Sequence, residues 1–228
     1  MSTIQRYLSA PWLMDAAKLA YCVPWAWRRL LVRTASFVHD GREYPYFSHP
    51  YNATWRNERA IEIPLIMPHV TGFEPMEVLE VGNVLSHYFP VRHLVVDRYE
   101  RRRCVLAGDI VGLELPRRFR RIVSISTLEH VGWDERPRVA GKHRRAIASM
   151  RRLLATDGQL IATIPMGYNP GLDDDLLGDR LGCAEVAYFK RSRATEWRAA
   201  PALEMQGTSY GKRFRAADGL ALCKWSAA

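Results

Sequence analysis

The segment Val78-Leu79-Glu80-Val81-Gly82-Asn83 most constrains how this 228-residue chain can fold. A short apolar run that stops at a glycine is typical of a buried parallel strand followed by a tight turn. A second apolar run over 93–96 ends at Asp97. Because the carboxyl ends of parallel strands meet at one edge of a sheet, this glycine turn and this acid predict a ligand site at that edge.

The same pattern of strands continues to residue 165. We expect strands over 77–81, 93–96, 103–107, 121–126 and 159–165, the start of a helix over 83–89, and a clear helix over 141–155. Strands that alternate with helices at this spacing indicate βαβ units. The predicted fold class is therefore α/β, a mostly parallel sheet flanked by helices, with a helical N-terminal extension.

The chain divides into an N-terminal extension and cap over 1–73 and a main domain over 74–228. Residues 1–38 have the pattern of two helices separated near Pro24, the second with an apolar face and an arginine-rich face. We favour a cap packed on the main domain; the alternative is peripheral contact with a membrane. Residues 39–73 are aromatic and polar, 166–180 are expected to form a loop, and the last forty or so residues to supply further strands.

The composition is that of a globular protein, with 48% hydrophobic and 25% charged residues. The net charge of +9 comes mostly from arginines scattered over several segments, so we interpret it as solvated surface and do not favour nucleic-acid binding. Cys22, Cys104, Cys183 and Cys223 lack zinc-site spacing and, without a secretory signal, are expected to be free thiols in the cytoplasm. The oligomeric state stays open, a homodimer included.

A nucleoside ligand at such a sheet edge has three chemical needs. A glycine turn lets the backbone come close, an acid after the second strand receives the ribose hydroxyls, and a further polar group meets the adenine amine. Gly82, Asp97 and Asp109 follow apolar runs in that order. A nicotinamide cofactor is disfavoured, because a pyrophosphate needs G-x-G-x-x-G and Gly82 has no such partners.

These motifs resemble those of the class I S-adenosylmethionine-dependent methyltransferases. Glu80-Val81-Gly82 resembles their first motif, Val95-Val96-Asp97 their ribose-binding strand end and Gly108-Asp109-Ile110 their adenine-contacting motif, and the similarity spans about 76–167. The resemblance implies a Rossmann-like fold, S-adenosyl-L-methionine as cofactor and methyl transfer. The cofactor-binding residues that it implies are Glu80, Gly82, Asn83, Ser86, Asp97, Arg98, Asp109, Ile110, Ser126 and Thr127.

The motif departs from the family at 83–86, where Asn-Val-Leu-Ser replaces further glycines. This leaves open a non-catalytic binding protein on the same fold, with its groove filled by Leu85 or Tyr88. A nucleic-acid methyltransferase is a third alternative, although the chain lacks the Asn/Asp-Pro-Pro-Tyr/Phe signature. The runs Ser-Thr-Leu-Glu-His-Val-Gly-Trp-Asp and Gly-Tyr-Asn-Pro are similar to a branch associated with polysaccharide and glycoconjugate modification.

For catalysis we single out His130, supported by Glu129, as a general base that removes a proton from an acceptor hydroxyl. The alternative is a histidine that packs under the cofactor. The expected reaction is O-methylation of a small polyhydroxylated acceptor, with a sugar or glycoconjugate as the favoured class. The expected substrate-binding residues are Tyr51, Trp55, Trp133, Tyr168 and Asn169, and no metal is expected, since Asp173-Asp174-Asp175 fits a solvated loop.

Overall fold

The computed structural model describes residues 35–102, 104–193, 195–214 and 216–227. Its centre is an eight-stranded sheet in the order β5-β4-β3-β6-β7-β10-β8-β9. The first five of these strands are mutually parallel, and β10, β8 and β9 join antiparallel. Their bounds are β3 Val78–Val81, β4 Leu94–Asp97, β5 Val105–Ala107, β6 Phe119–Ile125, β7 Leu154–Pro165, β8 Glu185–Arg193, β9 Glu196–Ala200 and β10 Gly219–Ser226. A mostly parallel α/β sheet is thus confirmed.

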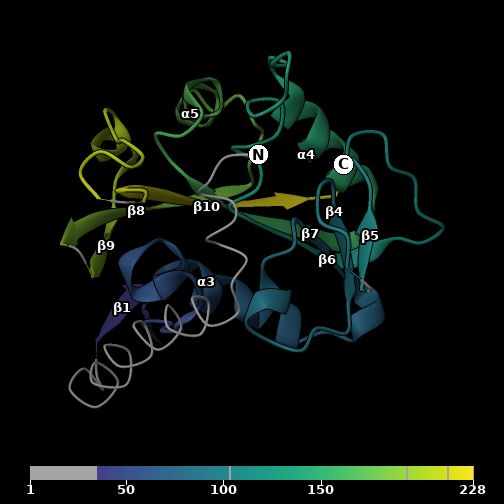
Figure 1. Cartoon of the computed structure of the whole chain (residues 1–228), viewed down its shortest axis with the longest axis horizontal. Coiled ribbons are helices and arrows are strands. Elements are labelled where there is room, and N and C mark those ends of the chain that lie inside the picture. Colours follow the sequence, from purple (N-terminus) through teal and green to yellow (C-terminus); the bar gives the residue numbers. More distant parts are fainter. Residues whose placement is uncertain (1–34, 103, 194, 215, 228) are drawn as a thin grey trace, which may run out of the picture.

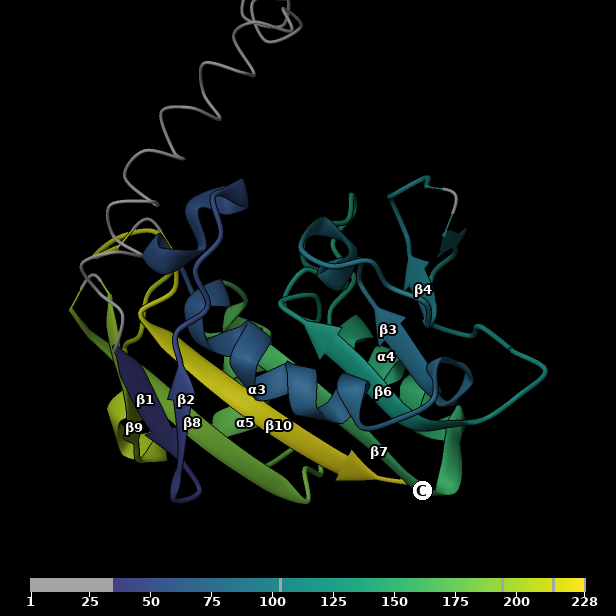
Figure 2. The ribbon, with the colours of Figure 1, turned by 90° about the horizontal axis from the view of Figure 1, so that it is seen from below.

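Helices cover both faces of this sheet. α4 (Lys142–Arg152) and α5 (Pro170–Leu177) lie on one face, and α3 (Arg59–Thr71) lies on the other (Figures 1 and 2). A separate hairpin of β1 (Ser36–His39) and β2 (Arg42–Pro45) stands beside β9 and α3. Four short 3₁₀ helices complete the described elements: η1 Tyr51–Arg56, η2 Pro75–Glu77, η3 Leu85–His87 and η4 Ala202–Met205.

The order of the strands creates a switch point between β3 and β6. From β3 the chain moves outward to β4 and β5, and it then returns to place β6 on the other side of β3. The connections after β3 and β6 therefore diverge at the carboxyl end of the sheet. Ligands of open α/β sheets bind in the crevice that such a divergence leaves.

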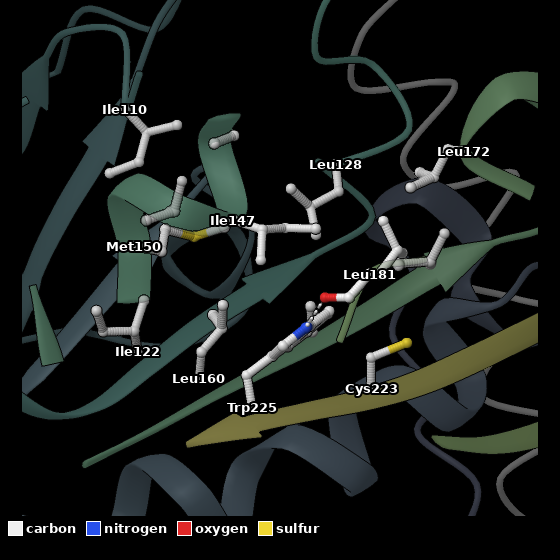
Figure 3. Close-up of a cluster of buried hydrophobic side chains, with 14 of the residues drawn as sticks. Ile110, Ile122, Leu128, Ile147, Met150, Leu160, Leu172, Leu181, Cys223 and Trp225 are labelled. Carbon is white, nitrogen blue, oxygen red and sulfur yellow. Dashed lines mark hydrogen bonds between the residues drawn. The ribbon is translucent and has the colours of Figure 1, made fainter. Parts of the chain in front are cut away.

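Two apolar cores hold the layers together. On the α4 side, Ile147 and Met150 pack over the sheet with Leu160, and Trp225 donates its indole N–H to the carbonyl of Leu181 at 2.9 Å (Figure 3). On the α3 side, Ile61 and Ile66 pack on Val123 and Ile161. Because β6 and β7 are covered on both faces, their residues 122–125 and 160–165 are buried continuously rather than at alternate positions.

The sequence did not predict α3, and its two prolines are the reason. A proline lacks the N–H that would bond the carbonyl four residues earlier, so Pro64 and Pro68 argue against a helix. The structure compensates at one of them: the carbonyl of Ala60, which Pro64 leaves free, accepts a hydrogen bond from the N–H of Phe47 at 2.8 Å. Neither proline is buried, so the hydrogen bonds within α3 are interrupted on the side of the helix away from the core.

Three further expectations need correction or fall outside the described residues. The helices predicted over 1–38 lie outside them except at the end, where residues 36–38 belong to β1 instead. The loop predicted over 166–180 contains α5, whose first turn Asn169 caps by accepting the N–H of Leu172. The helix start predicted over 83–89 is only η3. No helix of the described ranges is both long and apolar enough to cross a membrane.

Candidate functional site

A cavity of about 330 Å³ opens at the switch point, at the carboxyl ends of β3, β4, β5 and β6. Its size is that of a small-molecule site. It is lined by Val81, Gly82, Asn83, Val84, Val96, Asp97, Arg98, Tyr99, Gly108, Asp109, Ile110, Ser126, Thr127, His130, Val131, Asp134 and Glu135. The structure therefore brings eight of the ten predicted cofactor-binding residues to one cavity, all but Glu80 and Ser86.

The turn after β3 needs glycine at residue 82. Gly82 has φ of +86°, a backbone conformation that costs other residues energy. A Cβ atom there would lie 2.0 Å from Oγ1 of Thr127, in the turn after β6. Gly82 thus lets two neighbouring turns approach closely and leaves space for a ligand between them.

Asp97 ends β4 and holds this turn in place. Its Oδ2 accepts the N–H of Asn83 at 3.0 Å, and its Oδ1 accepts the N–H groups of Tyr99 and Glu100 at 2.8 Å each. A carboxylate offers about four acceptor sites, and these three bonds leave one on Oδ2. Asp97 can therefore accept a further hydrogen bond from a ligand hydroxyl.

Glu80 lies beneath the cavity rather than in its wall. It is fully buried, and its Oε1 accepts the N–H groups of Val84 and Leu85 at 2.8 Å each, while Oε2 lies 2.9 Å from Nε2 of His93. Leu85 packs into the core on the α3 side and does not line the cavity. The departure at 83–86 is thus accommodated by a carboxylate that holds the turn and by a leucine that points away from the cavity.

Ser86 also lies outside the cavity wall. Its hydroxyl donates to Oδ1 of Asn83, so it orients a residue that does line the cavity. The amide nitrogen of Asn83 donates in turn to Oε2 of Glu100 at 2.6 Å.

Four charged groups form a cluster at the β5 side of the cavity. Nζ of Lys142 donates to Asp109 and Glu135 at 2.6 Å each, and Arg98 pairs with the same two carboxylates. Burial is the largest single influence and acts to raise the pKa of Asp109, but the hydrogen bonds from Lys142 and the Val111 N–H and the charges of Lys142 and Arg98 together leave that pKa below its ordinary value. Asp109 is therefore ionised and engaged with two cations, while Ile110 supplies a buried apolar surface beside it.

His130 faces the cavity from the turn after β6. Its Nδ1 lies 2.7 Å from Oδ2 of Asp134, which also accepts the hydroxyl of Tyr168 at 3.0 Å. The Tyr168 ring stands edge-on to the imidazole, with the two ring centroids 4.6 Å apart. When Nδ1 donates to Asp134, Nε2 remains free to accept a proton.

Glu129 precedes His130 but is deeply buried, with 2% of its surface exposed. Its Oε1 lies 3.5 Å from Nε2 of His130, and its backbone carbonyl accepts the amide N–H of Asn169 at 3.0 Å. Through this hydrogen bond Asn169, at the start of α5, holds the turn after β6 in position. Burial raises the pKa of the Glu129 carboxyl group well above its ordinary value.

None of the five predicted substrate-binding residues lines the cavity, and only Tyr168 and Asn169 contact residues next to it. Tyr51 is half exposed on η1 and stacks on the ring of His87 at 5.0 Å, and Trp55 lies on the same 3₁₀ helix. Trp133 carries the guanidinium of Arg138 on its ring face at 3.8 Å, in a separate surface depression. Tyr168 touches the site through Asp134, and Asn169 through Glu129.

Two charged residues of the cavity wall, Asp134 and Glu135, are missing from the sequence prediction. The spacing His130-x-x-x-Asp134 was a usable signal, because residues four apart meet on one side of a helical turn. Glu135 had no such signal, since its partner Arg98 lies 37 residues earlier in the chain and Lys142 seven residues later, which is not the spacing of one helical turn.

The cavity wall carries more negative than positive charge. Asp97, Asp109, Asp134 and Glu135 contribute carboxylates, whereas Arg98 contributes the one guanidinium among the lining residues that the structure describes. Even with Lys142 behind the wall, carboxylates outnumber cations. The site therefore favours a cationic ligand over a phosphate-bearing one.

Comparison with known proteins gives similarity at the level of solved structures alone, because no family model and no curated protein matches the chain. One similar structure is the N-methyltransferase NodS from Bradyrhizobium japonicum WM9 in complex with S-adenosyl-L-homocysteine. It is 16% identical, the match covers 75% of this chain and 87% of NodS, and the TM-score is 0.42.

Two further similar structures are also S-adenosylmethionine-dependent methyltransferases. A possible histamine N-methyltransferase from Thermotoga maritima is 14% identical, with 71% of this chain and 87% of that chain covered and a TM-score of 0.40. A TehB-like enzyme from Corynebacterium glutamicum ATCC 13032 is 14% identical, with 71% and 86% covered and a TM-score of 0.38.

Proposed function

We propose that this protein is an S-adenosylmethionine-dependent O-methyltransferase that acts on a hydroxyl of a small polyhydroxylated acceptor, such as a sugar or glycoconjugate. One observation carries the proposal: a single cavity at the switch point joins the Asp97 carboxylate to the His130–Asp134 pair. The first group suits a ribose, and the second suits removal of a hydroxyl proton.

The residues of the cavity fit the cofactor. The remaining acceptor site on Asp97 suits a ribose hydroxyl, and Val96 and Ile110 offer apolar surface to an adenine ring. The excess of carboxylates suits a ligand with a sulfonium and an ammonium group. S-adenosylmethionine has both cations and no phosphate, which matches this wall better than a dinucleotide does.

The bound cofactor supplies a methyl group activated by its sulfonium. The chain supplies alignment and proton removal, because methyl transfer to a hydroxyl requires an in-line approach and loss of the hydroxyl proton. Asp134 holds His130 through Nδ1, and Tyr168 holds Asp134. In this arrangement Nε2 of His130 is the group that accepts the proton.

The geometry is less favourable to the two alternatives. A binding protein with a filled groove would place Leu85 or Tyr88 in the cavity, whereas neither residue lines it. A nucleic-acid methyltransferase would admit a phosphate backbone at a site whose walls carry mainly carboxylates. Methylation of a small hydroxylated acceptor is the function that the site supports best.

Calorimetric titration with S-adenosylmethionine and S-adenosylhomocysteine tests the proposal. We expect both to bind, and Asp97→Ala to weaken binding by about 10- to 100-fold, the effect of removing a charged hydrogen-bond acceptor together with its support for the turn. Asp157→Ala is the matched control, since Asp157 pairs with Arg120 away from the cavity. Absence of binding by either compound at millimolar concentration would overturn the proposal.

A further inference from the structure

A second group of charged side chains lies directly behind the His130 side of the cavity. Glu58 and Glu62 come from the start of α3, and Glu129 comes from the turn after β6. Their exposed fractions are 5%, 0% and 2%. Burial of three carboxylates in one region requires that each be paired, protonated or engaged by a ligand.

Glu62 is paired completely within the protein. Its Oε1 accepts the hydroxyl of Ser126 at 2.6 Å, and its Oε2 pairs with Arg59. Arg59 also donates to Ser126 Oγ at 2.6 Å. Because Ser126 lines the cofactor cavity, this network connects that cavity to the carboxylate group.

Glu58 also has partners of its own. Its Oε2 accepts the N–H of Ala217 at 3.2 Å, and it interacts electrostatically with Arg59 and Arg191. Arg191 interacts with Asp218 as well. Arg59 and Arg191 thus face Glu58, Glu62 and Asp218, so carboxylates outnumber guanidinium groups here even without Glu129.

Glu129 is the member whose carboxyl group remains incompletely engaged. Its Oε2 is buried and has no hydrogen-bond partner among the residues that the structure describes. Its Oε1 reaches toward Nε2 of His130 at 3.5 Å, the nitrogen that takes the acceptor's proton in the proposed reaction. An acceptor placed at His130 would therefore also lie next to Glu129.

Two aromatic rings stand in the same region. Tyr168 contacts His130, and the Tyr210 ring lies edge-on to Tyr168 with centroids 5.1 Å apart. Tyr210 interacts electrostatically with Glu129. A buried carboxyl group beside tyrosine rings is a setting that binds organic ammonium ions, through charge and through the faces of the rings.

We infer that the acceptor carries a protonated amine beside the hydroxyl that is methylated, and that Glu129 binds this ammonium group. The inference rests on the proposed function and narrows its acceptor class to amino sugars and related amino alcohols. Glu129 is a substrate-binding residue in this account, and the orientation of His130 is left to Asp134.

Burial raises the pKa of Glu129 in the empty site, and the bound ammonium group opposes this shift, so that Glu129 binds it as a carboxylate after giving up its proton to solvent. The ammonium group keeps its own protons throughout the reaction. The hydroxyl oxygen forms a bond to the methyl carbon, and the sulfur–carbon bond breaks with its electron pair remaining on sulfur. The hydroxyl proton moves to Nε2 of His130. Since the ammonium nitrogen has no lone pair while it is bound to Glu129, the methyl group goes to oxygen and the product is an O-methyl ether.

The test compares three sets of acceptors with the full-length protein: free hexosamines, their N-acetyl derivatives and neutral hexoses. Formation of S-adenosylhomocysteine gives the rates, and mass spectrometry with NMR of the products locates the methyl group. We expect kcat/KM to be about 10- to 100-fold higher for one or more hexosamines than for the matching acetylated and neutral sugars, as for loss of a charged hydrogen bond.

Glu129→Gln keeps the shape of the side chain and should reduce this preference to within about threefold, by raising KM for the hexosamine. Glu114→Gln, at an exposed position, is the matched control and should keep the preference. The inference is overturned by equal rates with neutral sugars, by a preference that survives in Glu129→Gln, or by N-methyl products. Cofactor binding without turnover of any hexosamine overturns the inference alone, whereas absence of cofactor binding overturns the proposed function as well.

Discussion

Replacing Gly82 by alanine tests the construction of the site most sharply. The new Cβ would lie 2.0 Å from Oγ1 and 2.9 Å from Cβ of Thr127, and the backbone has φ of +86°. The hydroxyl of Thr127 cannot simply rotate away, because it donates to the carbonyl of Ile125 at 2.9 Å. The substitution therefore forces the turns after β3 and β6 apart.

Two costs add in this variant. A left-handed backbone costs a residue with a Cβ about 1–2 kcal/mol, and overpacking a closely packed contact costs about 1–3 kcal/mol more. The expected loss in the free energy of unfolding is thus about 2–5 kcal/mol. Gly112→Ala isolates the first cost, since Gly112 has φ of +80° and nothing within 4 Å of its Cβ position.

Urea denaturation of both variants and the parent protein measures the difference. We expect Gly82→Ala to lose at least about 1 kcal/mol more than Gly112→Ala, and to lose cofactor affinity where Gly112→Ala does not. Adding Thr127→Ala should recover part of the stability, but not all, because the contact at 2.9 Å remains. Equal losses in the two single variants would refute the close approach of the two turns.

Three further predictions address catalysis and pH. His130→Ala should lower kcat by about 10²- to 10⁴-fold, and Asp134→Asn should lower it by less. Calorimetry should show a nearly unchanged cofactor affinity in both variants. A parent-like kcat in His130→Ala would exclude His130 as the base. Hydrogen bonds, first from Arg144, hold the pKa of Asp175 below its ordinary 3.8. Asp175→Asn should therefore lose about 1–3 kcal/mol of stability at pH 7. Chemical denaturation should show this difference shrinking as pH falls below about 4. Burial raises the pKa of Asp173 to about 6 from 3.8, so the native state binds more protons than the unfolded state between these pH values. Relative to Asp173→Asn, the parent should therefore lose about 1–3 kcal/mol of unfolding free energy as pH rises from 4 to 7. Parallel stability curves for the two proteins would contradict this assignment.

The residues that sequence analysis placed at the site are those fixed by local rules. A strand that ends in a glycine turn, or at an acid, can be recognised from a few neighbouring residues, so Gly82, Asp97 and Asp109 were predicted to lie together and do. Glu80 was recognised from its motif, but its carboxylate holds the turn from below the cavity. The motif indicated the position of this residue and not which way its side chain points.

What the sequence did not reveal depends on contacts between distant segments. α3 was hidden by Pro64, whose missing hydrogen bond is compensated by Phe47, a partner outside the helix. The network of Glu62 with Ser126 joins α3 to the turn after β6, and no local pattern encodes that proximity. The incomplete pairing of Glu129 likewise becomes visible only when its surroundings are known in three dimensions.

A crystal structure of the protein with S-adenosylhomocysteine bound would test the central claim most directly. The account predicts that the nucleoside occupies the cavity at the switch point, with a ribose hydroxyl on Oδ2 of Asp97 and the sulfur directed toward the His130 side. A ligand bound elsewhere, or a cavity that stays empty at saturating concentration while the protein is folded, would contradict it.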